Sequence, residues 1–480
     1  MSKIRVVFKN ISWLAVAQMI NSICAFFWTI VIANYLGVTK YGIISFSTSF
    51  IGIAILLIDL GITTYVTREV ARNRKRLDEY INLTLPLKLI LSFAVFFLGL
   101  FFLIVSGCGK TTIVVTLIYM VEMILMTFTQ LINGIFQAYE ELKYQSIGAL
   151  INCGLLIGGI LITILSDWGI YGIALSYVVG YSGFFGFMAW RYVKQFGWPS
   201  PKINCSKSLL IIKKSLPFGI TTLFNTIYFG INTVMLSGMK GDYEAGIYKA
   251  VFNILLVFTT LFSVYQLVLF PVVSNFFVNQ KGLIQKSYEK SVKYLMAVIL
   301  PICAGIFFYA KQILMLIYNQ SYGEAILPLK ISIWTVIVLF LNGATILVLN
   351  AINMERRVTM IYLLGAVVNV LINLLLVPGY SYNGSAVATL TSCSFIFLIL
   401  LTQISKTEFQ PGIHLLMDVV KIAIATMGMF LVLCVLHPSL WVGIFVGVLV
   451  YGALFIGLRL VDETDCTLLK LLIHKEKEEQ

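Results

Sequence analysis

The chain has 480 residues, of which 59% are hydrophobic and only 11% are charged, and its mean hydropathy is +0.94. This composition excludes a soluble globular protein and indicates a membrane protein with many spans. The net charge of +13 is expected to serve membrane topology and attraction to anionic lipid, rather than to form a nucleic-acid surface.

Apolar runs separated by short polar loops fill the whole chain. Each run is long enough to cross the hydrocarbon core as a helix, whereas an open sheet would leave backbone groups unpaired in lipid. We therefore expect an all-α polytopic protein with about 14 membrane helices, at residues 11–35, 42–67, 84–105, 112–136, 145–165, 170–190, 215–237, 245–276, 293–317, 327–352, 358–377, 384–405, 417–436 and 440–459.

Lys and Arg residues set the orientation of these spans. If the N-terminus lies in the cytoplasm, all of them fall on cytoplasmic segments except Lys40, Lys110, Lys240, Lys249, Lys311 and Lys330. This bias follows the positive-inside rule and predicts a multi-pass cell-membrane protein with both termini in the cytoplasm. Neither the 8 cysteines nor the 3 histidines show the spacing of a disulfide framework or a metal site, so no metal is expected.

The second span is polar along one face. At 100° per residue its polar positions fall within an arc of roughly 60°, and they are Ser45, Thr48, Gly52, Asp59 and Thr63. The fourth span adds Glu122, Thr129 and Asn133, and the first adds Gln18 and Asn21. Hydroxyls and amides at such positions can simply join helix to helix.

Ionisable side chains at membrane depth are costly and are therefore candidates for function. In the first half of the chain these are Asp59 and Glu122. Arg68, at the cytoplasmic end of the second span, suits a gate as well as it suits an inner-face anchor. Lys88, Lys311 and Lys330 lie near predicted span ends, so we expect them to extend toward water.

The segment S-G-C-G-K-T-T, Ser106 to Thr112, resembles the phosphate loop of an ATPase. That loop requires a glycine where this chain has Ile104, and it connects a strand to a helix. Here it follows an apolar run and falls in a short loop predicted to lie outside the cell. We therefore expect no nucleotide binding at Lys110.

The second half of the chain repeats the first weakly. At an offset of 204 residues, Asn21, Thr29, Gly37 and Gly42 coincide with Asn225, Thr233, Gly241 and Gly246. The repeat predicts two parallel, pseudo-symmetric six-helix lobes around a central cavity. We assign 1–193 and 215–405 to the lobes, 194–214 to a cytoplasmic linker, 406–460 to two additional helices and 461–480 to a cytoplasmic tail.

The eighth span carries a polar face equivalent to that of the second. Lys249, Asn253, Thr260 and Ser263 fall within an arc of about 80°, and the seventh span contributes Asn225, Tyr228 and Asn232. Equivalent polar faces in the two lobes are expected if both lobes line one cavity.

Three segments carry a family resemblance: N-x-x-W-L-A-x-A-Q, I-A-N-Y-L-G-V-T-K-Y-G-I-I-S-F and D-L-G-I-T-T-Y-V-T-R-E-V-A-R-N. They resemble the Wzx-type polysaccharide biosynthesis flippases, which move O-antigen repeat units and belong to the multidrug/oligosaccharidyl-lipid/polysaccharide (MOP) exporter superfamily. The resemblance implies alternating access and translocation of a polyprenyl-diphosphate-linked oligosaccharide to the outer leaflet. It implies no enzyme activity, and its expected partners are this cargo, membrane lipid and proteins of glycan assembly.

The implied cargo suggests roles for the polar residues. A diphosphate needs a cation, which Lys249 can supply, and sugar hydroxyls suit amides and aromatic rings. The candidate cargo-binding residues are Lys249, Asn253, Asn21, Asn225, Tyr228, Asn232 and Thr260. Asp59, Glu122 and Arg68 are candidates for ion coupling or for a gate. The coupling cation, Na⁺ or H⁺, is the only cofactor expected.

Two other functions remain open. A cation-coupled multidrug exporter of the same superfamily would share the fold, and would use its interior acids to exchange a cation for an organic cation. A membrane-embedded polymerase or glycosyltransferase would need a large extracytoplasmic loop with catalytic residues, and the predicted outer loops are short.

Overall fold

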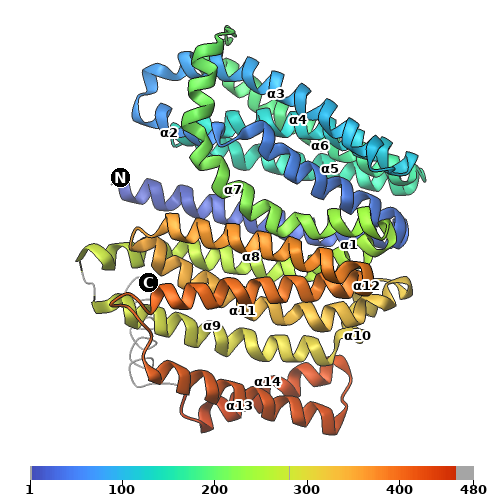
Figure 1. Cartoon of the computed structure of the whole chain (residues 1–480), viewed down its shortest axis with the longest axis vertical. Helices are drawn as coiled ribbons and strands as arrows, with labels where there is room; N and C mark the ends of the chain where they lie inside the picture. Colours follow the sequence, from blue (N-terminus) through green and yellow to red (C-terminus); the bar gives the residue numbers. More distant parts are fainter. Residues whose placement is uncertain (1–2, 280–281, 461–480) are drawn as a thin grey trace, which may run out of the picture. The chain divides into compact units, whose positions relative to one another are not determined.

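The computed structural model describes the backbone of residues 3–279 and 282–460, and every regular element in these ranges is a helix (Figure 1). The helices are α1 (Lys3–Asp59), α2 (Ile62–Arg72), η1 (Arg74–Arg76), α3 (Leu77–Val105), α4 (Lys110–Ala138), α5 (Leu142–Leu165), α6 (Gly169–Phe196), α7 (Cys205–Met239), α8 (Asp242–Asn279), α9 (Gly282–Phe308), α10 (Ala310–Ile317), η2 (Gln320–Ala325), α11 (Ile326–Ala351), α12 (Glu355–Ile404), α13 (Ile413–Leu436) and α14 (Leu440–Gly457).

The prediction of an all-α polytopic membrane protein is confirmed. Within the described ranges, 11 helices are long and apolar enough to cross a membrane. Two of these, α1 and α12, change direction at Gly37 (φ 73°) and Ser381 (φ 50°), so each can supply two spans. Together with α7, these helices account for a total of about 14 spans, as helix length requires.

The second predicted span, 42–67, is not one continuous helix, and this expectation was wrong. The helix stops at Asp59, and Leu60 and Gly61 have φ values of 45° and 78° before α2 begins. A Cβ atom at Gly61 would collide with the backbone of α7 at Ser215 and Gly219. Glycine is therefore needed at position 61 both for its conformation and for this close approach.

Other helix boundaries also differ from the predicted ones. Helix α3 begins at Leu77 rather than at residue 84, which places Lys88 three turns inside the helix. The predicted ninth span, 293–317, is divided at Tyr309 into α9 and α10.

The described helices form two compact units. Unit 1 comprises Met1–Thr260, Tyr318–Pro328 and Tyr362–Ser392, and unit 2 comprises Leu261–Ile317, Leu329–Ile361 and Cys393–Gln480. In unit 1, α6 packs on α4 and α5, and α1 packs on α4 and α7 (Figure 1). In unit 2, α13 packs on α9 and α14. The predicted lobe and linker boundaries remain predictions, and the tail 461–480 lies outside the described residues.

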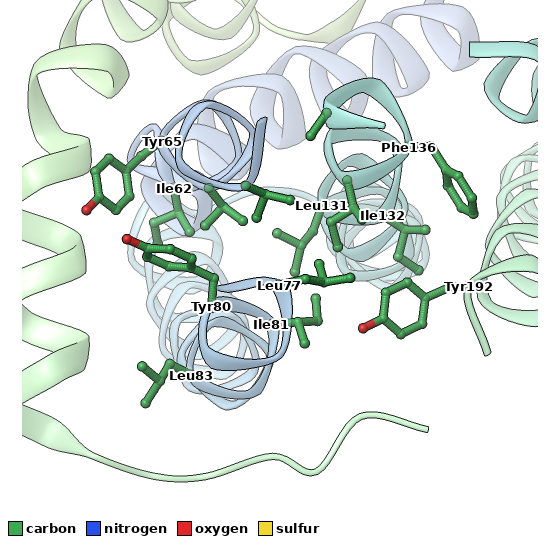
Figure 2. Close-up of a cluster of buried hydrophobic side chains, with 14 of the residues drawn as sticks. Ile62, Tyr65, Leu77, Tyr80, Ile81, Leu83, Leu131, Ile132, Phe136 and Tyr192 are labelled. Atoms are coloured by element: carbon green, nitrogen blue, oxygen red, sulfur yellow. The ribbon is translucent and has the colours of Figure 1, made fainter. Parts of the chain in front are cut away.

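A buried apolar cluster holds α2 in place after the break at Gly61 (Figure 2). Ile62 and Tyr65 of α2 contact a core that includes Tyr80 of α3 and Leu131 of α4, and each of these side chains is at most 5% exposed. The rings of Tyr65 and Tyr80 meet edge to face with centroids 6.0 Å apart. Burial of these side chains fixes the position of α2 and with it the end of α1 at Asp59.

The predicted repeat is visible in the backbone of unit 1. Gly37 and Gly241, which coincide at the offset of 204, both have positive φ (73° and 121°) and both mark a change of chain direction. The next coincident pair, Gly42 of α1 and Gly246 of α8, lies at a helix crossing. A Cβ atom at Gly42 would collide with the carbonyl oxygen of Asp242, and one at Gly246 with that of Val38.

Candidate polar sites in the helix interior

The break after Asp59 creates a buried ion pair that the sequence did not predict. Nζ of Lys88, on α3, lies 2.6 Å from Oδ1 of Asp59, and the Lys88 side chain is fully buried. The same ammonium donates hydrogen bonds to the Thr63 hydroxyl at 2.8 Å and to the Thr127 carbonyl at 3.3 Å. Lys88 therefore does not extend toward water, and the expectation that it would do so was wrong. The Lys88 ammonium instead compensates the negative charge of Asp59.

Arg68 lies on α2, one helix beyond this pair. Its guanidinium forms a 2.9 Å ion pair with the neighbouring Glu69 and lies 5.6 Å from the ring centroid of Tyr65. The side chain of Arg68 is 41% exposed. Its role as a gate residue is untested and stays a prediction.

Glu122 differs from Asp59 in having no charged partner among the residues that the structure describes. It lies on α4 and is 4% exposed, and its Oε2 is buried without a hydrogen-bond partner among the described residues. One turn earlier on α4, the hydroxyl of Tyr119 is also buried and also lacks a partner there. The Tyr119 ring packs on that of Tyr177, from α6, with centroids 5.3 Å apart.

A tyrosine cluster joins the two repeats where Gly42 and Gly246 cross. The amide of Asn253 on α8 donates a hydrogen bond to the hydroxyl of Tyr41 on α1. The Tyr322 hydroxyl donates to the Ala33 carbonyl at 3.1 Å, and that of Tyr318 donates to the Ala250 carbonyl at 3.2 Å. Asn253, predicted to contact cargo, is thus 5% exposed and engaged in closing this end of the bundle.

The same end is closed by two further contacts. Thr112, at the start of α4, donates a 2.9 Å hydrogen bond to the carboxylate of Asp242, at the start of α8. The backbone N–H of Asn319 donates to the side chain of Asn34 at 2.9 Å. These loops belong to the predicted outer side, so within unit 1 the two repeats meet at that side.

Asn232, another predicted cargo ligand, belongs to a buried network of amides and hydroxyls. Its Nδ2 donates to Tyr248 and Thr389, both at 2.9 Å, and its Oδ1 accepts from Asn373 at 2.7 Å. Asn373 also accepts from Ser385 at 2.7 Å. The network joins α7, α8 and α12, and its amides are fully hydrogen-bonded. Pairing across such distant segments gave no local signal in the sequence.

Lys249 contrasts with the paired Lys88. It is half-buried on α8, and its Nζ lies 5.5 Å from the ring centroid of Phe252. It forms no hydrogen bond and no ion pair with any residue that the structure describes. On the equivalent face of α1, a Cβ atom at Gly52 would meet no atom within 4 Å, so space is open there.

The remaining predicted cargo residues are less informative. Thr260 donates to the Leu256 carbonyl of its own helix at 3.0 Å. The side chains of Asn21, Asn225 and Tyr228 lie outside the described residues. Their roles remain predictions.

Unit 2 contains a second buried ion pair and an apolar groove. Lys293 of α9 lies 3.2 Å from Asp418 of α13, and the lysine side chain is 4% exposed. The groove has a volume of about 600 Å³ and lies between α9, α10, α13 and α14, with Pro301, Met429 and Trp441 among its lining residues. Gly443 leaves room for Tyr309, whose hydroxyl donates to the Pro438 carbonyl at 3.0 Å.

The phosphate-loop-like segment lies between two membrane helices. Helix α3 ends at Val105, and Lys110 is an exposed residue at the first position of α4. Because no strand precedes the loop, the backbone lacks the strand-to-helix arrangement that cradles nucleotide phosphates. That this segment binds no nucleotide stays a prediction.

Solved structures with the same fold include two transport proteins. The structure of "Lipid II flippase MurJ, inward closed conformation" has a TM-score of 0.78 at 14% identity, covering 92% of this chain and 98% of that chain. The inward-facing conformation of a multidrug resistance MATE family transporter of the MOP superfamily has a TM-score of 0.67 at 16% identity, covering 82% and 98%. The chain therefore shares the fold of these two proteins.

Sequence comparison gives the family. An uncharacterized membrane protein of Methanocaldococcus jannaschii is 22% identical over an alignment of 414 positions that covers 82% of this chain and 96% of that protein. Residues 7–277, more than half of the chain, match the family described as polysaccharide biosynthesis protein. Together with the helical fold and its interior polar groups, this match shows that the chain belongs to the polysaccharide biosynthesis protein family.

Proposed function

We propose that the protein is a flippase that moves a polyprenyl-diphosphate-linked oligosaccharide from the cytoplasmic to the outer leaflet by alternating access. Family membership supports a role in surface polysaccharide biosynthesis. The MOP fold supports transport through a cavity between two lobes. Both termini are proposed to lie in the cytoplasm.

The state of Lys249 is the observation that carries this proposal. Lys88 and Lys293, the two fully or nearly fully buried lysines, each have a carboxylate within 3.2 Å. Lys249 has no such partner among the described residues, although a cation at membrane depth is costly unless an anion or water compensates it. An anionic cargo supplies that compensation, and a diphosphate does so through charge-assisted hydrogen bonds.

The same state of Lys249 argues against an exporter of organic cations. A cationic cargo would be repelled by an uncompensated ammonium on its path. The apolar groove of unit 2 provides separate support, because a surface of this kind suits a prenyl chain.

Lys249→Ala tests the proposal. We expect it to abolish or strongly impair complementation of a flippase-deficient strain while the protein still inserts, and Lys249→Arg to retain more activity because it keeps the charge. Membrane abundance is measured in parallel. Lys240→Ala, which removes an exposed lysine between α7 and α8, is the matched control and should complement.

Two results would contradict the proposal. One is full complementation by Lys249→Ala at wild-type abundance. The other is efflux of cationic dyes by the purified protein in proteoliposomes combined with no binding of polyprenyl diphosphate, which would favour the multidrug exporter. Sugar transfer or polymerisation by the purified protein would favour the enzyme, although the described connections between helices are short, such as 197–204 and 405–412.

The proposed orientation has its own test. A cysteine introduced at Arg74, in the connection between α2 and α3, should resist a membrane-impermeant thiol reagent in intact cells and react after the cells are opened. A cysteine at Lys110 should react in intact cells. Reversal of this pattern would overturn the orientation.

A further inference from the structure

Two acidic side chains lie in the helix interior of unit 1, and only one of them is compensated. Asp59 has the ammonium of Lys88 at 2.6 Å and accepts a hydrogen bond from Thr63. Glu122 is more deeply buried, at 4% exposure, and its Oε2 has no hydrogen-bond partner among the described residues. An ionised carboxylate in such a place would carry a large desolvation cost with nothing to offset it.

The described groups that interact with Glu122 are uncharged. Tyr119 of its own helix and Tyr177 and Tyr181 of α6 lie close enough to interact with it electrostatically. The other helices packed on α4 are α1, α2, α3 and α5, and no charged side chain that the structure describes on them acts on Glu122. Lys88 of α3 is a buried cation, but its ammonium donates to Asp59 and to the Thr127 carbonyl.

A proton satisfies Glu122 better than a metal ion does. Hard cations need several oxygen ligands, with carboxylates and carbonyls preferred. The described surroundings of Glu122 offer phenol hydroxyls, and no group of three His, Cys, Asp or Glu that could hold a metal ion occurs among the described residues. A proton needs only one carboxylate oxygen, and it removes the charge that makes burial of this side chain costly.

We propose that Glu122 is a proton-binding site, loaded in the conformation observed here, and that its proton couples cargo movement to the transmembrane proton gradient. In the cycle the carboxylate takes up one H⁺, remains neutral while α4 and α6 enclose it, and returns the H⁺ to water when the helices separate. No other bond changes. The inference rests on the proposed flippase function and assigns the coupling role to Glu122 rather than to Asp59 or Arg68.

Infrared difference spectroscopy on the purified full-length protein in nanodiscs tests proton binding without any cargo. We expect the C=O band of a protonated carboxylic acid in the wild type, persisting when Na⁺ is added at constant pH. Glu122→Gln should lack this band. Glu140→Gln, which changes an exposed acid after α4, is the matched control and should keep it.

A second readout covers the case in which Glu122→Gln does not insert. A hydrophobic carbodiimide modifies protonated carboxyl groups in apolar surroundings, and peptide mass spectrometry locates the modified residue. In the wild type we expect modification at Glu122 and no protection by Na⁺. Absence of modification there, protection by Na⁺, or an infrared band that survives in Glu122→Gln would each overturn the proton site.

Transport in proteoliposomes then tests coupling. A pH gradient should accelerate wild-type flipping of a polyprenyl-diphosphate-linked sugar, whereas a Na⁺ gradient should not, and Glu122→Gln should lose the response to pH while still binding polyprenyl diphosphate. Stimulation by Na⁺ alone would overturn coupling by protons. If the wild type binds no polyprenyl diphosphate but the infrared band still depends on Glu122, the flippase proposal fails and the proton site stands.

Discussion

Two polar clusters in unit 1 differ in how completely their hydrogen bonds are made. Around Asn232 and Asn373, amides and hydroxyls from α7, α8 and α12 pair with one another at 2.7–2.9 Å. Around Glu122 on α4, the carboxylate Oε2 and the Tyr119 hydroxyl have no partner among the described residues. Both clusters are buried, so solvent does not explain the difference.

The difference separates polar groups that stabilise the fold through their hydrogen bonds from polar groups that can still bind a proton or a ligand. A satisfied network stabilises one helix arrangement, because each amide has its partners only there. An unsatisfied group costs free energy in the resting structure and is retained where a proton or a ligand completes it. The same division separates Lys88, which has Asp59, from Lys249, which lacks a described partner. The following predictions test this division on stability.

The largest loss of stability is expected when one member of a buried ion pair is removed. Lys88→Met leaves the Asp59 carboxylate without its cation, and we expect the free energy of unfolding to fall by about 3–5 kcal/mol. The double variant Lys88→Met/Asp59→Asn should recover most of this loss because no charge remains. Unfolding of the purified proteins in nanodiscs measures both. A single variant as stable as the wild type would show that the pair is not buried as described.

A smaller loss is expected in the amide network. Asn373→Ala leaves the Asn232 carbonyl oxygen and the Ser385 hydroxyl without a partner, at a cost of about 1–3 kcal/mol for each group. Thr391→Ala, on an exposed face of the same helix, is the control and should be nearly neutral. Equal unfolding curves for the two variants would remove the distinction between the network and the surface.

Removal of a hydroxyl that has no partner should cost almost nothing. Tyr119→Phe is expected to change the free energy of unfolding by less than about 0.5 kcal/mol, or to stabilise slightly, because no hydrogen bond is lost. Tyr248→Phe is the matched comparison, and it should destabilise by about 1–3 kcal/mol because Asn232 donates to that hydroxyl. The reverse order would mean that Tyr119, rather than Tyr248, serves the stability of the fold.

The smallest effect is expected at the phosphate-loop-like segment. Lys110→Ala should leave complementation and unfolding unchanged because the side chain is exposed at the start of α4. ATP should not shift the unfolding temperature of either protein. Loss of transport together with specific ATP binding would contradict this prediction.

Hydrophobic runs predicted most of the membrane helices, because the length and apolarity of a run are local properties of the sequence. Gly37 and Gly241, which coincide at the repeat offset, both have positive φ. Gly42 and Gly246, the next coincident pair, both lie against a carbonyl oxygen of the opposite helix. The break at Leu60–Gly61 was missed, since a helical wheel assumes a continuous helix and the need for glycine at position 61 comes from α7. The early start of α3 was missed too, and this alone placed Lys88 wrongly near a span end.

The polar sites were predicted less well than the helices. Glu122 and Lys249 became candidates because a charge in an apolar run is visible in the sequence, and their functional roles stay predictions. Whether a polar residue finds hydrogen-bond partners depends on residues far along the chain. Asn232, for example, accepts a hydrogen bond from Asn373, which lies 141 positions away. Asn253 likewise contacts Tyr41 at a separation of 212. A polar stripe therefore predicted the face of the helix but not which of its members have hydrogen-bond partners in the fold.

The crossing of Gly42 and Gly246 restricts which mutations can repair one another. Each glycine leaves space for a carbonyl oxygen of the opposite helix, and neither residue can become smaller. A substitution at one position therefore has no complementary substitution at the other. Second-site mutations that restore function to Gly42→Ala should lie away from the crossing, at residues where a substitution accommodates a larger distance between α1 and α8. The two halves of the chain thus share one genetic constraint, although the residues that impose it are 204 positions apart.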